Sequence, residues 1–206
     1  MPSKRTFFNA LAVLTIVVMV VAASPTALAT SEPPFEIRFP QQTSVTEFDS
    51  TFGAGRSGGR RHKGNDLMAP KMTPVYAAAD GVVVTISDGK TSGRYLTIDH
   101  VDGWSTSYMH LNNDDPGTDN GRADWSHTLA PGIEEGVSVS AGQLIGFVGD
   151  SGNAEWTGSH THFELRKNGT AMNPYNLLLE AFRRDERLLV GVDRLLTSQV
   201  IPAYME

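Results

Sequence analysis

Apolar and polar residues alternate in several short runs through the middle of the chain. This alternation is typical of half-buried β-strands, because side chains on a strand point to opposite faces in turn. Asp-Gly and Asn-Gly pairs separate several of the runs and favour tight turns. The predicted strands are residues 75–77, 82–86, 95–99, 104–111, 137–139, 144–148 and 160–166. We therefore expect a mainly β fold with a compact antiparallel sheet.

The pattern changes near the C-terminus. Asn173 followed by Pro174 is a favourable helix start, because Asn caps the first turn and Pro suits the first helical position. Apolar residues then recur mostly at helical spacing, at Leu177, Leu178, Ala181, Phe182, Leu188 and Leu189. This predicts one amphipathic helix over about residues 174–189, packed on the sheet, with a less regular tail after it.

The first 29 residues follow a third pattern. Lys4 and Arg5 precede an apolar run over residues 10–23, and Ala27-Leu28-Ala29 fits a cleavage site built from small residues. This layout is typical of a secretory signal peptide, so we expect export and cleavage after Ala29. The alternative is an uncleaved membrane anchor, but the apolar run is short of the roughly 20 residues that span a bilayer. We expect a secreted, extracytoplasmic protein without a stable membrane span.

Length, composition and charge narrow the class of protein. The chain has 206 residues, 40% of them hydrophobic, which suits one domain with a substantial core. It has no cysteine, which excludes disulfides and thiolate metal sites. The formal charge of −6 becomes −8 once Lys4 and Arg5 are removed, which argues against a nucleic-acid partner. We divide the chain into a signal peptide (1–29), a short leader (30–51), a main domain (52–174) and a helical extension (175–206), and expect a monomer.

Candidate chemistry is concentrated in the histidines. His62 and Asp66 are four residues apart with a glycine between them, so both side chains can face one point. In the last predicted strand, alternation puts His160, His162 and Glu164 on one face and the residues between them on the other. Two imidazoles on one face of a strand can share a small site.

A third segment adds His110. Alternation along residues 104–111 predicts that Tyr108 and His110 share a face, opposite Met109 and Leu111. Histidines and an aspartate from three segments, in a chain without cysteine, favour a divalent first-row metal, with zinc as the first choice. These residues alone leave open a zinc hydrolase and a cupin-like oxygenase or isomerase, although the latter would usually place its glutamate further along than Glu164.

Taken together, these motifs resemble the M23 family of zinc metallopeptidases, the lysostaphin and LytM type, which cut peptides in bacterial cell walls. The matching segments are residues 62–70, 73–83, 97–100, 103–104, 108–111, 137–149 and 157–164. The resemblance covers about residues 52–174, and it implies the antiparallel β core of that family for the main domain.

The resemblance also implies a role for each candidate residue. His62, Asp66 and His162 match the family's zinc ligands, with one Zn2+ per chain. His110 and His160 match its two active-site histidines that do not bind the metal. The implied reaction is hydrolysis of peptide bonds in peptidoglycan stem peptides or cross-bridges, by a zinc-activated water flanked by two histidines.

One alternative function and several departures accompany the resemblance. The alternative is a non-catalytic M23-like domain that binds the cell wall or activates another hydrolase, but such relatives normally lack metal ligands that are present here. Ser159 and Thr161 differ mildly from the family pattern, and Thr161 should point away from the metal. The polar loop over residues 112–135 is longer than in the smallest members.

The other conspicuous residues are expected to have ordinary roles. His100 should be structural, because it lies at a strand end. His127 should be solvated in the long loop. The cluster of Arg56, Arg60 and Arg61 should be a solvated loop, with contact to an anionic substrate as the less favoured reading.

Overall fold

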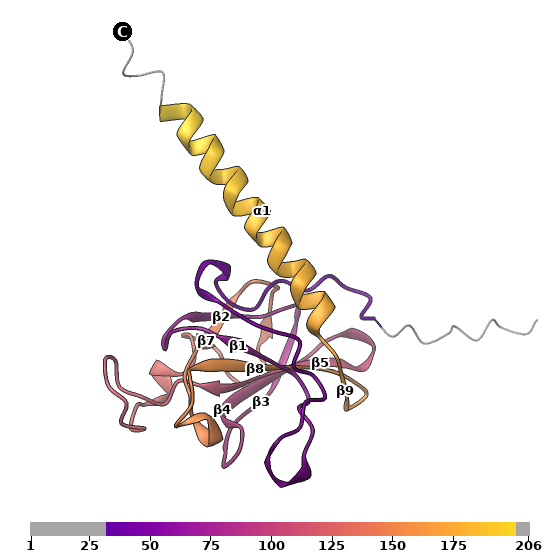
Figure 1. Ribbon diagram of the computed structural model, residues 1–206, viewed down its shortest axis with the longest axis vertical. Helices are drawn as coiled ribbons and strands as arrows, with labels where there is room; N and C mark the ends of the chain where they lie inside the picture. Colours follow the sequence, from indigo (N-terminus) through magenta and orange to yellow (C-terminus); the bar gives the residue numbers. More distant parts are fainter. Residues whose placement is uncertain (1–31, 201–206) are drawn as a thin grey trace, which may run out of the picture. The chain divides into compact units, whose positions relative to one another are not determined.

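The computed structural model describes residues 32–200 (Figure 1), so the predicted signal peptide lies outside the described residues. The strands are β1 Asn65–Met68, β2 Pro74–Tyr76, β3 Gly81–Gly89, β4 Gly93–Asp99, β5 Trp104–Leu111, β6 Ser138–Val139, β7 Leu144–Phe147, β8 His160–Lys167 and β9 Thr170–Met172. One helix, α1 Tyr175–Val200, follows them. In this described part no helix has the length and apolar character to cross a membrane.

All strand pairs are antiparallel, which confirms the predicted mainly β class. The larger sheet has the order β1-β8-β5-β4-β3-β6, with β9 beside β8, and β2 pairs with β7 in a second small sheet. Two strands were not predicted, β1 and β9. Because Asn65 and Asp66 are poor strand formers, β1 has no local strand signal and depends on pairing with β8.

The hydrophobic core lies on one face of the larger sheet. Leu67, Leu96, Ile98, Phe163 and Leu165 are at most 1% exposed. Further core residues come from the segment before β1, where Ile37 and Phe39 are buried. The Phe39 ring lies 5.0 Å from that of Phe182 in α1, so this segment and the helix cover the core together.

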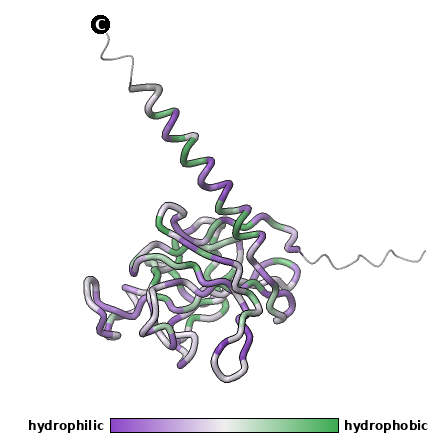
Figure 2. Tube along the Cα trace, viewed as in Figure 1, coloured by the Kyte–Doolittle hydropathy of each residue, from purple (hydrophilic) through white to green (hydrophobic). Residues whose placement is uncertain are grey.

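Helix α1 is longer than predicted. Its first turns pack against the core through Leu178 and Ala181, which are buried. The later turns continue past residue 189 with exposed apolar side chains, among them Leu195 and Leu196. Figure 2 shows polar and apolar residues alternating along the coloured part of the helix. The prediction ended it too early, because helical spacing continues to Leu196 and the helix runs through Gly191.

Candidate metal and active site

Three side chains converge on one point between β1 and β8. His62 Nε2 lies 3.0 Å from Asp66 Oδ1 and 2.8 Å from His162 Nδ1, and the latter lies 2.8 Å from Asp66 Oδ1. Asp66 faces His162 directly in the register of the two strands. Two ring nitrogens and one carboxylate oxygen this close together form a donor set that suits a divalent cation.

The glycine within the His62–Asp66 motif allows this convergence. A Cβ atom at Gly64 would lie 2.1 Å from the carbonyl oxygen of Phe163 in β8. Any larger residue would push the motif away from β8, and Asp66 would lose its place opposite His162. The spacing of the motif is therefore tied to the close approach of two backbones.

The outer contacts of these ligands orient their lone pairs. His62 Nδ1 lies 3.0 Å from the Thr51 carbonyl, and His162 Nε2 lies 3.2 Å from Glu164 Oε1. With a metal ion bound, a proton on each of these nitrogens would leave His62 Nε2 and His162 Nδ1 as unprotonated ligands. Without the ion, the same two atoms can donate to Asp66 Oδ1. Arg166 in turn holds Glu164, with Nε 2.7 Å from Oε2. Metal-binding histidines typically have this outer partner, so the residues present fit a metal such as zinc.

Charge in the site is balanced within the cluster. Burial raises the pKa of Asp66, but hydrogen bonds from His162 and His62 outweigh it and hold the pKa well below its usual range. Arg56 adds to this environment, because its Nη2 lies 2.5 Å from Asp66 Oδ2. Burial lowers the pKa of His162, but its bonds to Asp66 and Glu164 reverse the direction and raise it. Asp66 is therefore ionised at neutral pH, as a metal ligand must be.

His110 and His160 flank this cluster. Their ring centroids lie 4.9 Å apart, and the His110 ring lies 6.0 Å from that of His162. Each Nδ1 is 2.8 Å from a backbone carbonyl, that of Ser151 for His110 and that of Gly158 for His160. Donation from Nδ1 leaves Nε2 of both rings as an acceptor. Burial and the neighbouring His160 lower the pKa of His110 to about 4, so it is neutral at pH 7.

The prediction that Tyr108 shares a face with His110 is wrong. Tyr108 is fully buried, and its hydroxyl accepts a hydrogen bond from the amide of Ala78 at 2.7 Å. Burial raises its pKa to about 12. Alternation fails because His110 has a φ of 60°, which turns its side chain to the same side as Met109, and both line the pocket. The backbone is held there by the Ser92 carbonyl, which accepts from the His110 amide at 2.9 Å.

The remaining site predictions concern β8 and the other histidines. His160, His162 and Glu164 line one pocket, whereas Thr161 is fully buried on the opposite face, as predicted. His100 is structural, with Nδ1 2.7 Å from the Asp80 carbonyl and Nε2 2.9 Å from Thr106 Oγ1. His127 is half-buried rather than solvated, and it lies in a 3-10 turn at Trp125–His127.

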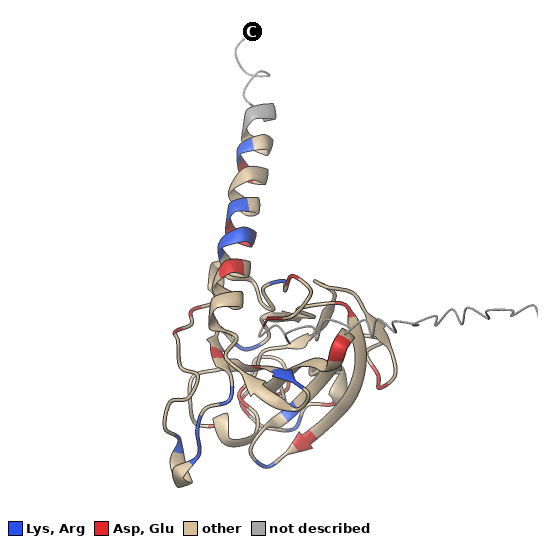
Figure 3. Cartoon of the chain, turned by 90° about the vertical axis from the view of Figure 1, so that its right-hand side faces the viewer, with Lys and Arg blue, Asp and Glu red and all other residues tan. Residues whose placement is uncertain are grey.

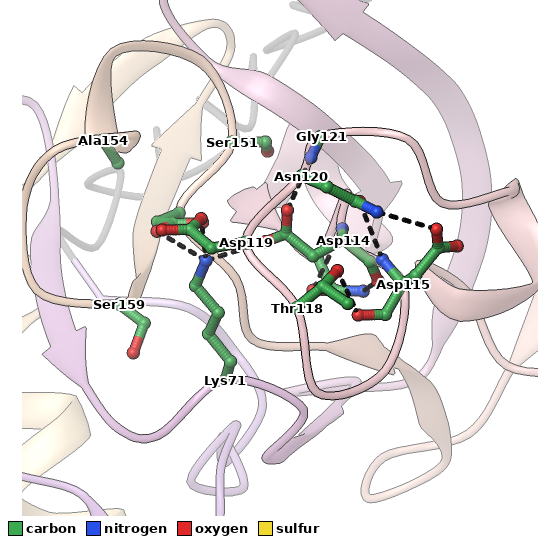
Figure 4. A network of polar contacts seen from close by, with 12 residues as sticks. Lys71, Asp114, Asp115, Thr118, Asp119, Asn120, Gly121, Ser151, Ala154 and Ser159 are labelled. Carbon is green, nitrogen blue, oxygen red and sulfur yellow. Dashed lines mark hydrogen bonds and ion pairs between the residues drawn. The ribbon is translucent and has the colours of Figure 1, made fainter.

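A second polar cluster, which sequence reasoning missed, anchors the long loop (Figure 4). Lys71 Nζ lies 2.7 Å from Asp114 Oδ2, 2.7 Å from Asp119 Oδ1 and 2.9 Å from Asp150 Oδ2. The single ammonium group offsets one of the three negative charges and holds the three carboxylates together. Asp150 also precedes Ser151, whose carbonyl accepts from His110. The Lys71 cluster therefore ties the loop wall to the backbone that orients His110.

Replacing Lys71 by methionine should destabilise the fold. The side chains of Asp114 and Asp150 are 2% and 5% exposed, so both would remain as buried charges without a counterion. We expect the free energy of unfolding to fall by about 2–4 kcal/mol, slightly below the ~3–5 kcal/mol of a fully buried pair because Lys71 is partly exposed. Chemical denaturation measures this change in the free energy of unfolding.

Lys90→Met is the matched control, because Lys90 is exposed. It should leave the denaturation midpoint unchanged. The double variant Lys71→Met with Asp150→Asn should recover part of the loss, since it removes one of the stranded charges. Equal midpoints for Lys71→Met and the unchanged protein would contradict the proposed role of this cluster.

Comparison with known proteins points to one family. The profile of Peptidase family M23 matches residues 60–174. The peptidoglycan DD-endopeptidase ShyC of Vibrio cholerae is 35% identical over 115 residues, which cover 56% of this chain and 22% of ShyC. Stage II sporulation protein Q of Bacillus subtilis is 33% identical over 118 residues, covering 56% of this chain and 36% of that protein. The chain thus spans less than a quarter of the length of ShyC.

Superposition on solved structures points to the same family. A zinc-containing peptidase from Vibrio cholerae superimposes with a TM-score of 0.54 and 26% identity, covering 67% of this chain and 39% of that one. A complex of SpoIIIAH and SpoIIQ contains a chain that superimposes with a TM-score of 0.55 and 25% identity, covering 68% of this chain and 99% of that one. Because the family profile spans more than half of the sequence, the chain belongs to peptidase family M23.

Proposed function

We propose that this protein is a zinc metalloendopeptidase that hydrolyses peptide bonds in peptidoglycan stem peptides or cross-bridges outside the cytoplasm. The observation that carries the proposal is the convergence of His62 Nε2, Asp66 Oδ1 and His162 Nδ1 within 3.0 Å of one another. Two further histidines flank that point in the same pocket. The peptidoglycan substrate is taken from the name of the relative ShyC.

In this proposal three residues hold one zinc ion and two act on protons. His62, Asp66 and His162 are the ligands, and three protein ligands leave a tetrahedral position open, as catalytic zinc sites require. Bound zinc supplies Lewis acidity at the scissile carbonyl and acidifies a water. His110, neutral at pH 7 and with Nε2 unprotonated, would be the proton acceptor beside the metal site. His160 would have the complementary role: once its Nε2 carries a proton, it could stabilise the developing negative charge or protonate the leaving amine.

Export rests on the sequence and on the family. The pattern of residues 1–29 predicts a cleaved signal peptide, and the named relative ShyC is a peptidoglycan peptidase. Because the chain's ligands are nitrogen and oxygen atoms, it needs no reduced thiol to hold a metal. An extracytoplasmic location therefore suits both the metal site and the proposed substrate.

The second candidate is a non-catalytic domain that acts through a protein partner. The specific observation behind it is the match to the SpoIIIAH and SpoIIQ complex, which shows that chains with this fold take part in protein assemblies. Against it, all five residues of the candidate site are present here and arranged around one pocket.

Metal removal distinguishes the two candidates. We expect one zinc per chain, hydrolysis of muropeptides by the zinc-loaded protein, complete loss of hydrolysis after chelation, and recovery when zinc is added back. The measurements are metal analysis and mass analysis of products from defined stem-peptide and cross-bridge substrates. Stoichiometric zinc without hydrolysis of any substrate in that panel would favour the non-catalytic candidate.

A further inference from the structure

A basic hairpin forms one wall of the pocket. Residues 53–61 fold back on themselves, with a β-bridge between Gly55 and Arg61 and an amide of Arg56 that donates to the Arg60 carbonyl at 2.9 Å. The hairpin leads directly into His62, whose amide donates to the Ala54 carbonyl. Figure 3 shows Lys and Arg on both arms of this loop, at the lower left of the view. Its position is therefore fixed relative to the proposed metal ligands.

The pocket wall is positive although the chain as a whole is acidic. The basic residues that line the pocket are Arg56, Arg60, Arg61 and Lys63. The acidic lining residues, Asp66 and Glu164, are both engaged with histidines and arginines of the site. A formal charge of −6 for the chain makes this local excess of positive charge specific to the pocket.

The four basic residues do not have the same role. Arg56 is bound to Asp66, so it belongs to the metal site. Arg60 donates from Nε and Nη2 to Ser57, and Arg61 donates from Nη1 to the Gly53 carbonyl. A guanidinium group has five N–H donors, so Arg60 and Arg61 retain donors for a ligand. Within residues 32–200, no carboxylate forms an ion pair with Arg60, Arg61 or Lys63.

We propose that Arg60 and Arg61, supported by Lys63, bind a free carboxylate of the peptide substrate beside the scissile bond. This inference rests on the proposed peptidase function and narrows its substrate to acidic peptides. Arginine matches a carboxylate with two parallel hydrogen bonds, and a positive wall also raises the local concentration of anionic peptides. The proposal gives the hairpin a binding role, which was the less favoured interpretation from the sequence alone.

The test compares two forms of one substrate. Cross-linked stem-peptide dimers are prepared with free carboxylates, and a second batch has these groups converted to carboxamides. The unchanged, zinc-loaded protein should show a KM about tenfold lower for the free-carboxylate dimers, which corresponds to about 1.4 kcal/mol, with a similar kcat. For both dimers, the double variant Arg60→Gln with Arg61→Gln should have the KM that the unchanged protein has for the carboxamide dimers. Lys replacements at both positions should restore part of the preference for free carboxylates.

Arg187→Gln in α1 is the matched control, because it removes an exposed arginine outside the pocket. It should keep the full preference. Zinc content and thermal melting establish that each variant is folded and loaded. Equal KM values of the unchanged protein for the two dimers, or an equal loss on both dimers in the double variant, would overturn the inference.

A binding measurement tests the carboxylate site independently of the proposed peptidase activity. If no dimer is hydrolysed, the proposed peptidase activity fails on these substrates. Calorimetric titration of the same two dimers into the zinc-loaded protein still measures carboxylate preference. Tighter binding of the free-carboxylate dimers, lost in the double variant, supports the hairpin as a carboxylate site, and equal binding overturns it.

Discussion

Replacing His162 by alanine should remove bound zinc and abolish hydrolysis. His162 lies opposite Asp66 in the register of β1 and β8, and its Nδ1 is 2.8 Å from both Asp66 Oδ1 and His62 Nε2. Its loss leaves two protein ligands. Because loss of an outer partner alone typically weakens metal binding by 10–100-fold, we expect zinc binding to weaken by about 100-fold or more. Metal analysis after dialysis and product analysis on muropeptides measure both effects.

The control for this variant is His127→Ala. His127 is half-buried and lies outside the pocket, so the same substitution there should leave zinc content and turnover unchanged. Thermal melting shows whether the His162 variant keeps its fold in the absence of metal. A folded His162→Ala protein that still binds one zinc tightly would show that the metal lies elsewhere.

Replacing His110 by alanine should separate metal binding from turnover. His110 contributes no atom to the convergence of His62, Asp66 and His162, so zinc content should stay at one per chain. Turnover should fall by about 10²–10⁴-fold, the usual contribution of a positioned general acid or base. The pKa of His110 is lowered to about 4, so the ring is unprotonated at the pH of the assay and its Nε2 can accept a proton.

Tyr108→Phe tests the corrected geometry beside it. Tyr108 points into the core, so the variant should keep full turnover. It should lose about 1–3 kcal/mol of stability, because the buried Ala78 amide would be left without its acceptor. A His110→Ala protein with full activity would refute the assigned role. A Tyr108→Phe protein with strongly reduced turnover would show that the tyrosine acts in the site despite its burial.

Local patterns predicted the parts of the site that lie within one strand. Strand β8 follows simple alternation, so the shared face of His160, His162 and Glu164 could be predicted from the sequence. Alternation failed at His110, because its left-handed backbone is held by contacts with residues distant in sequence, such as Ser92. A two-residue period contains no information about such contacts.

Local patterns were enough to predict the mainly β class, the start of the C-terminal helix and the candidate histidines, and they carried the resemblance to M23. These features depend on residue type and short spacing. The tertiary structure decided that β1 pairs with β8, that Lys71 gathers three aspartates, and that the Arg60 and Arg61 arms face the pocket. Each of these joins segments far apart in the chain, and pairing, ion clusters and pocket walls exist only once the backbone brings such segments together.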